Sequence, residues 1–339
     1  MMTKHTSSRI GWIDTAKGIG LLCVILGHLH IPLVDTWVYF FHMPLFFFLS
    51  GVVFSGGKYD FKTFLGKKLR SLVIPYFTLG GGIFLFWCLL YALDGNPGAD
   101  YLEMLKKFLV QEHWWTVWFL ACLFLTELIY YGIHRLFGKD ARIASAVSAV
   151  LCGFGILRYR LGWGSLPWNL DVALVAQFFF HLGFCFKGVA PRLSRFDGLK
   201  TIPKLLLVGL MMGLDLVLGF VCIRVSGASL DMSVGWYGNV LLVFPSALCG
   251  IGGVILLARM LRWKWLTWLG RHTMVIFAWH SRIVIVACDR LYAHLGLFQG
   301  GGLTDTLGAA ACTFAAIIAL LVPATFAIKA SRVHGAFGL

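Results

Sequence analysis

The stretch Ala16-Lys17-Gly18-Ile19-Gly20-Leu21-Leu22-Cys23-Val24-Ile25-Leu26-Gly27-His28 places a lysine at the start of an apolar run and a histidine at its far end. In an α-helix the interval from Lys17 to His28 spans about 16 Å, roughly half of a hydrocarbon core about 30 Å thick. We therefore expect Lys17 at the edge of a membrane and His28 near its midplane. An ionisable side chain at that depth costs free energy, and by default it indicates a functional site.

The composition of the whole chain is that of a polytopic membrane protein. Of its 339 residues, 59% are hydrophobic and only 13% are charged, and the mean hydropathy is +0.82. A soluble domain would carry roughly 25% charged residues. The nine cysteines form no Cys-x-x-Cys pair, so the sequence predicts neither a zinc site nor a disulfide framework. The first residues are polar and the first apolar run is long, which predicts no cleavable signal. We expect one integral-membrane domain over residues 1–339.

Apolar stretches along the chain approach the length of about 20 residues that a spanning helix needs. They lie near residues 17–34, 37–55, 72–93, 114–134, 143–162, 168–187, 204–224, 236–258, 272–295 and 304–328. We therefore predict an all-α polytopic membrane protein with about ten transmembrane helices.

The positive charges predict the orientation of these helices. With the N-terminus inside, 22 of the 29 Lys and Arg residues lie in inside segments and 5 in outside segments, and Arg282 and Arg290 lie within the ninth span. Positive residues concentrate on the cytoplasmic side of membrane proteins, so both termini are expected inside. The net charge of +14 then reports topology and gives no reason to expect a nucleic-acid partner.

Two buried ionisable residues are the first catalytic candidates. His28 is either a structural histidine bonded to a neighbouring carbonyl or a general base suited to proton transfer near neutral pH. Glu127 lies at a similar expected depth in the fourth span. One hypothesis is that Glu127 pairs with His28, fixes its tautomer and stabilises the imidazolium.

Basic residues on the inside are candidates for binding an anionic ligand. Lys67 and Arg70 are spaced i, i+3, so both could reach one phosphate group from one helix face, and Lys68 lies beside them. The alternative is ordinary positive-inside charge, which contacts anionic lipid. For Lys17, a contact with the ligand, with Asp14 or with lipid is left open. His42 and His280 are further polar groups within spans, for which structural hydrogen bonds are the alternative.

The pattern as a whole resembles the acyltransferase 3 family of integral-membrane O-acyltransferases, and within it the branch described as fucose 4-O-acetylase-like. The residues that carry the resemblance are Asp14-x-x-Lys17-Gly18 with His28, Phe41-His42-Met43-Pro44 followed by Leu45 to Gly51, Lys67-x-x-Arg70 with Pro75, Trp118-Phe119-Leu120 with Glu127, and Trp279-His280. Lys17 and Lys67 stand where many relatives have arginine. A lysine ammonium is a compact charge and lacks the planar guanidinium that can bind a phosphate through two parallel hydrogen bonds.

The resemblance implies a function and roles for these residues. A cytosolic acyl-CoA, usually acetyl-CoA, would donate an acyl group to a hydroxyl of an extracytoplasmic or lipid-linked carbohydrate, in the cell's inner membrane and without a metal. His28 and Glu127 are the predicted catalytic residues. The donor would be bound by Lys17, Lys67, Lys68 and Arg70, and substrate would contact His42, Trp118 and His280.

Two other classes of protein fit parts of the pattern. A transporter or flippase for a lipid-linked saccharide would also carry buried His, Glu and Asp residues. Against it, the two halves of the chain show no matching interrupted helices of the kind found in inverted-repeat transporters. A membrane sensor or scaffold without catalysis is the third reading. Only the acyltransferase requires binding of acyl-CoA, and none of the three readings fixes the oligomeric state.

Overall fold

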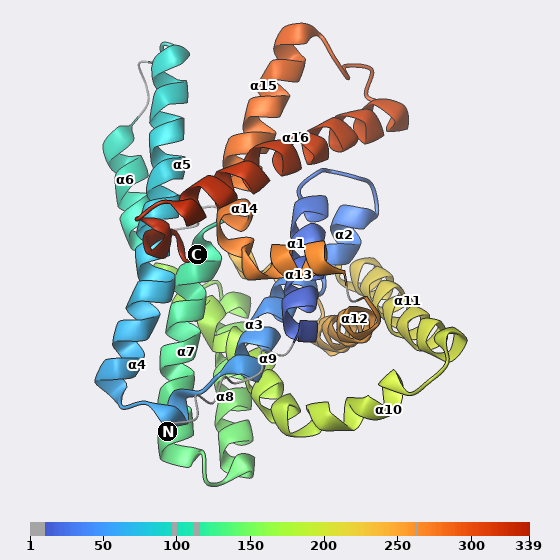
Figure 1. Ribbon diagram of the computed structural model, residues 1–339. Coiled ribbons are helices and arrows are strands. Elements are labelled where there is room, and N and C mark those ends of the chain that lie inside the picture. The colour runs from blue at the N-terminus through green and yellow to red at the C-terminus, as the bar shows by residue number, and fades with distance from the viewer. Residues whose placement is uncertain (1–10, 97–99, 112–115, 262) are drawn as a thin grey trace, which may run out of the picture.

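The computed structural model describes residues 11–96, 100–111, 116–261 and 263–339. Helices account for nearly all the regular structure of these residues, which otherwise contain one isolated bridge between Asp231 and Trp236. Within these described ranges, eight helical segments are long and apolar enough to cross a membrane. The expectation of an all-α polytopic membrane protein is confirmed (Figure 1).

The helices follow one another along the chain with short connections. The α-helices are α1 (Gly11–Gly27), α2 (Val34–Tyr39), α3 (His42–Val53), α4 (Phe61–Lys68), α5 (Ile74–Leu93), α6 (Tyr101–Val110), α7 (Trp118–Phe137), α8 (Ala141–Arg160), α9 (Leu170–Val189), α10 (Ser194–Asp197), α11 (Thr201–Ser226), α12 (Val240–Met260), α13 (Lys264–Arg271), α14 (Thr273–Trp279), α15 (Val286–Leu295) and α16 (Leu303–Ala330). Short 3-10 helices are η1 (Gly56–Lys58), η3 (Pro167–Asn169), η4 (Ala190–Leu193), η5 (Met232–Val234) and η7 (His334–Phe337), and π-helical turns are η2 (Leu69–Val73) and η6 (His280–Ile285).

Two of the ten expected spans differ from the eight long apolar segments. The first is α1, which has 17 residues and ends at Gly27. The second is the continuous run α14–η6–α15, which carries Arg282, Asp289 and Arg290. The expected start of the fourth span at residue 114 lies outside the described residues. The number ten and the orientation therefore stay predictions.

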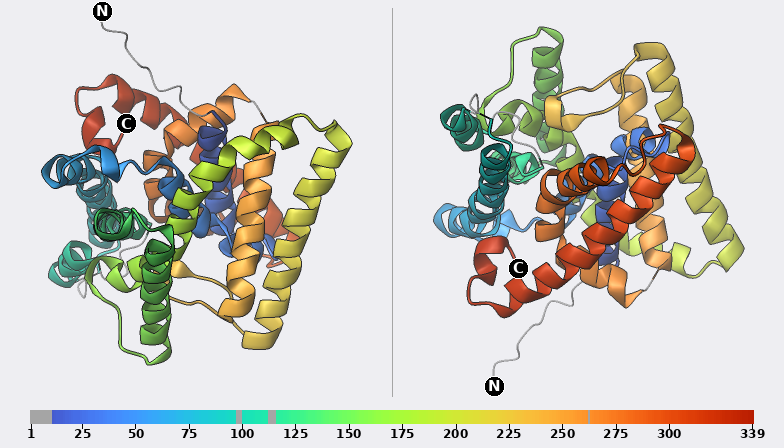
Figure 2. Two further views of the ribbon diagram at one scale, coloured as in Figure 1. Left: turned by 90° about the horizontal axis from the view of Figure 1, so that it is seen from below. Right: turned by 90° about the horizontal axis from the view of Figure 1, so that it is seen from above.

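Helix α1 lies at the centre of the bundle. It contacts α2, α3, α12, α13 and α14. The antiparallel pair α11 and α12 covers one flank of the bundle, while α5, α6 and α7 lie on the other (Figures 1 and 2). Because His28 directly follows α1, this central position brings it close to residues from both halves of the chain.

Glycine residues allow close approach of helices around this centre. A Cβ atom on Gly51 of α3 would overlap the carbonyl oxygen of Phe180 in α9, and one on Gly183 of α9 would overlap that of Phe48. The same holds between α1 and α13, where a Cβ on Gly270 would overlap the carbonyl oxygen of Asp14. Lipid tails are as apolar as the helix surfaces, so there is no hydrophobic driving force between helices in a membrane. Tight packing there depends on small residues that let the backbones approach closely.

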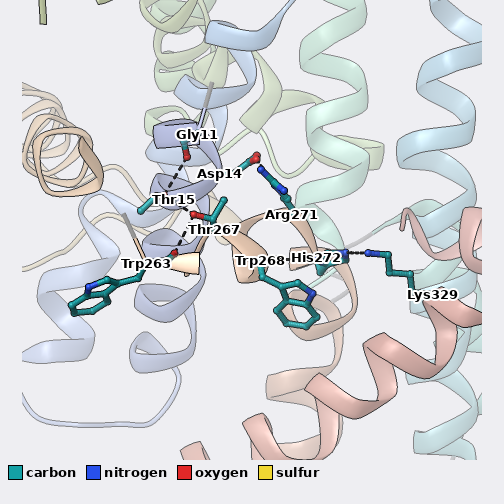
Figure 3. A network of polar contacts seen from close by, with 9 residues as sticks. All are labelled: Gly11, Asp14, Thr15, Trp263, Thr267, Trp268, Arg271, His272 and Lys329. Atoms are coloured by element: carbon teal, nitrogen blue, oxygen red, sulfur yellow. Dashed lines mark hydrogen bonds and ion pairs between the residues drawn. The ribbon is translucent and has the colours of Figure 1, made fainter. Parts of the chain in front are cut away.

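Polar contacts hold the N-terminal half of α1 against α13. Arg271 donates a hydrogen bond to the carboxylate of Asp14 at 2.7 Å, and the hydroxyls of Thr15 and Thr267 lie 3.1 Å apart (Figure 3). The next residue, His272, accepts a hydrogen bond from Lys329 of α16 at 2.8 Å (Figure 3). Through α13, the start of α1 is therefore tied to the end of the last long helix.

Candidate active site

A cavity of about 620 Å³ lies at the C-terminal end of α1. Its walls come from the turn after α1, the starts of α3 and α7, the connection between α11 and α12, and the η6–α15 segment. The polar and aromatic lining residues are His28, His30, Tyr39, His42, Thr116, Trp118, Asp231, Ser233, Phe277, Ser281, Arg282 and Asp289. Among the predicted site residues, the cavity thus brings together His28, His42 and Trp118.

His28 is partly buried in the wall of this cavity. Its Nδ1 atom lies 2.8 Å from the carbonyl oxygen of Val24, one turn earlier. The Nε2 atom of His280 lies 3.4 Å from the same Nδ1, and the two rings are nearly perpendicular with centroids 4.9 Å apart. Arg282 and Asp231 are near enough to act on the charge of His28. The histidine is therefore held on one edge of its ring and lies beside charged groups of the cavity.

His42 and Trp118 also line the cavity. His42 is the first residue of α3, is 3% exposed, and has its Nδ1 2.7 Å from the carbonyl oxygen of Val38. Tyr39 packs edge-on against His42 with ring centroids 4.9 Å apart. Trp118 begins α7 and contacts Phe47 in the core. Both residues are in position to contact a molecule in the cavity.

His280 lies behind His28 and is fully buried. It contacts the carbonyl oxygens of Ile276 and Phe277 through Nδ1, at 3.1 and 2.8 Å. It is not part of the cavity lining. Outside its own helix it contacts His28, and its predicted contact with substrate stays a prediction.

Glu127 does not pair with His28, so that hypothesis is wrong. Its buried carboxylate forms a salt bridge with Lys68 of α4, and Lys17 is near enough to act on its charge. The physical reason is that α7 packs against the α4–η2 segment, which offers the carboxylate an ammonium group. Meanwhile the bonded edge of His28 faces Val24 and His280. A second cluster therefore joins Lys17, Lys68 and Glu127 from three helices.

Lys67 and Arg70 lie on the surface beside this second cluster. The Lys67 amine lies 3.4 Å from the centroid of the Tyr59 ring, and its hydrogen bond lowers the pKa of the Tyr59 phenol below the usual value. Arg70 is exposed within the π-helical turn η2. Arg70 thus follows α4 in a turn wider than that of an α-helix, and the expectation that Lys67 and Arg70 share one face stays a prediction.

Several cavity residues were missed by the sequence interpretation. Asp231 and Ser233 come from the connection between α11 and α12, and Tyr39 from the short helix α2. Only their polar or aromatic type could have suggested them, since nothing in the local sequence links these segments to His28. Within the described ranges, no group of three or more His, Cys, Asp or Glu residues could hold a metal ion.

The fold and the cavity define an integral-membrane protein with a histidine in a polar chamber. Residues 10–326 match the acyltransferase domain of the acyltransferase 3 family, and the chain belongs to that family.

Two curated relatives match parts of the chain. The nodulation protein NolL of Sinorhizobium fredii is 29% identical over 199 residues, which are 51% of this chain and 47% of the relative. The nodulation protein NolL of Mesorhizobium japonicum is 34% identical over 99 residues, which are 25% of this chain and 24% of the relative. The chain thus aligns with less than half the length of each. No solved structure matches.

Proposed function

We propose that this protein transfers an acyl group, in the first place acetyl, from cytosolic acyl-CoA to a hydroxyl of an extracytoplasmic or lipid-linked carbohydrate at the inner membrane. The observation that carries the proposal is His28 in the wall of a 620 Å³ cavity, inside a chain of the acyltransferase 3 family. His28 is the general base. Family membership favours this function over a transporter.

The hydrogen bond to Val24 supports this role for His28. A carbonyl oxygen can only accept, so the Nδ1 atom that lies 2.8 Å from it carries the proton. In the neutral ring, Nε2 then has a free lone pair. Among the described residues, none donates a hydrogen bond to that atom, and His28 lines the cavity. A hydroxyl bound there would meet an unprotonated imidazole nitrogen.

With His28 as the base, acyl transfer from the thioester to the acceptor hydroxyl takes two steps. Nε2 of His28 removes the proton of the acceptor hydroxyl while its oxygen forms a bond to the thioester carbonyl carbon. The tetrahedral intermediate collapses as the carbon–sulfur bond breaks, and the imidazolium returns the proton to the thiolate. An acyl-histidine intermediate is the variant in which Nε2 attacks the thioester first. Arg282 in the same cavity is a cation that could stabilise the oxyanion.

The lining of the cavity suits a carbohydrate acceptor. The carboxylates of Asp231 and Asp289 can accept hydrogen bonds from sugar hydroxyls, while Tyr39 and Trp118 offer aromatic faces for a sugar ring. Under the predicted orientation, the turn after α1 and the connection between α11 and α12, which line the cavity, lie on the outer side of the membrane. The acceptor would thus approach His28 from the extracytoplasmic side.

The donor would approach from the other end of α1. Lys17, Lys67, Lys68 and Arg70 provide positive charge on the predicted inner side for the phosphates of CoA. Because Lys68 is already paired with Glu127, exposed Arg70 and Lys67 are better suited to the first contact with phosphate. Glu127 would then act on the donor side, where it orders Lys68.

An assay with radiolabelled acetyl-CoA tests the proposal. The purified protein in lipid nanodiscs is incubated with acetyl-CoA and a panel of nitrophenyl glycosides, and acetylated glycoside is counted. The wild type should acetylate at least one glycoside, and His28→Gln should lose at least 100-fold in kcat. His181→Gln, which replaces a buried histidine in α9 bonded to Tyr130 and Ser145, is the control for folding. Near-normal turnover by His28→Gln would remove His28 as the base.

A further inference from the structure

The contact between His28 and His280 joins residues that are 252 positions apart in the sequence. The function proposed above uses His28 alone and leaves His280 without a task. His280 is fully buried, lies outside the cavity lining, and has its Nε2 atom 3.4 Å from Nδ1 of His28. The imidazole of His280 therefore either stabilises its own helical segment or affects the properties of the neighbouring His28.

The protonation of His280 follows from its contacts. Its Nδ1 atom lies 2.8 Å from the carbonyl oxygen of Phe277 and 3.1 Å from that of Ile276. Both oxygens can only accept, so Nδ1 carries a proton. A positive charge on a fully buried ring would be costly, and the neutral ring leaves a lone pair on Nε2. That lone pair faces Nδ1 of His28.

Hydrogen bonds from neighbouring segments hold the backbone around His280. Trp279 donates a hydrogen bond from Nε1 to the carbonyl oxygen of Leu79 in α5 at 3.1 Å. Thr116 donates to the carbonyl oxygen of Ala278 at 2.6 Å, and Trp87 of α5 donates to that of Arg282 at 3.2 Å. The π-helical turn η6 begins at His280 itself, and such turns occur often at functional sites.

We infer that His280 is a positioning residue for His28, whose Nδ1 proton it accepts together with the carbonyl oxygen of Val24. Two acceptors on one edge of the ring fix the tautomer of His28 and its rotation about χ2. They also favour the imidazolium that forms when His28 takes the acceptor proton. This is the task that the sequence had suggested for Glu127, carried out here by a neutral ring from the other end of the chain.

Two substitutions of similar polarity separate positioning from a purely structural role. In His280→Asn the amide occupies the place of Nδ1, so it can still donate to Phe277, but it does not reach His28. In His280→Gln the amide oxygen reaches toward the place of Nε2 and can accept the proton of His28. We expect kcat of His280→Asn to fall by roughly 10- to 100-fold with an unchanged KM for the acceptor. His280→Gln should recover a large part of that loss, and His181→Asn should leave kcat unchanged.

The inference rests on the proposed function. The activity of His28→Gln is therefore measured in parallel, with the glycoside that the assay above identifies as an acceptor. If His28→Gln is inactive while His280→Asn keeps the wild-type kcat, His28 stands as the base and the role of His280 is overturned. Equal losses in the Asn and Gln variants, or a raised acceptor KM at constant kcat, would also overturn it. Should one of the two variants not fold, the other is still decisive, because the inference expects a 10- to 100-fold loss of kcat for His280→Asn and only a small part of that loss for His280→Gln.

Discussion

The salt bridge between Lys68 and Glu127 is the feature at the residue scale whose removal has the largest expected effect on stability. Glu127 is 5% exposed, and breaking a buried ion pair by removing one partner leaves an uncompensated charge. Lys68→Met should therefore lower the free energy of unfolding by about 3 kcal/mol. The double variant Lys68→Met/Glu127→Gln should recover most of it. Thermal unfolding in detergent provides the measurement, and a double variant no more stable than Lys68→Met would contradict the argument.

Arg70 gives the corresponding prediction for the donor. Its guanidinium is exposed on η2, so a contact with a CoA phosphate would contribute about 1 kcal/mol in solvent. Arg70→Ala should raise the KM for acetyl-CoA about fivefold and leave kcat nearly unchanged. Lys139→Ala removes an equally exposed cation from the connection between α7 and α8 and is the matched control. An unchanged KM in Arg70→Ala would remove Arg70 from the donor site.

The sequence pointed to ionisable residues that lie in polar clusters, but it did not predict their partners. His28 and Glu127 were chosen because each is ionisable within an apolar run, and both indeed lie in polar clusters. Their pairing was inferred from similar depth alone. Depth says nothing about the direction in which a side chain leaves its helix, and that direction separates Glu127, which faces Lys68, from His28, which faces His280.

Helix packing of α1 against α13 provides the prediction at the element scale. Gly270→Ala would place a methyl group onto the carbonyl oxygen of Asp14, which forces the two helices apart. We expect a loss of about 1–3 kcal/mol in the free energy of unfolding and a lower kcat, since α1 positions His28. Gly209→Ala is the control, because a Cβ there has no atom within 4 Å and should be neutral or stabilising by about 0.5–1 kcal/mol. A Gly270→Ala protein as stable as Gly209→Ala would show that the helices do not need this approach.

The helices themselves were largely predictable, and their interruptions were not. Runs of apolar residues give the eight long segments, because the bilayer requires both length and hydropathy. The end of α1 at Gly27 and the π-helical turns η2 and η6 depend on tertiary contacts, such as those of Trp279 and Trp87 with neighbouring helices. His28, Arg70 and His280 lie at or next to these interruptions, so the helices are least regular where the predicted site residues lie.

At the scale of the whole molecule, the two polar clusters have to face opposite sides of the membrane for the proposed reaction. The cavity with His28 is lined by the connection between α11 and α12, while the cluster of Lys17, Lys68 and Glu127 lies toward the basic segments. The bias of positive charges predicts that these basic segments are cytoplasmic. His28 would then stand between a donor from inside and an acceptor from outside.

Cysteine labelling tests this arrangement with two matched substitutions. Val234 lines the cavity and is 40% exposed, and Val333 lies after α16 and is 57% exposed. In a background without the nine native cysteines, Val234→Cys should react with a membrane-impermeant maleimide in intact cells. Val333→Cys should react only after permeabilisation, because the inside positive charge places the C-terminus in the cytosol. The reverse pattern would put the cavity on the donor side, and both substrates would then have to reach His28 from the cytosol.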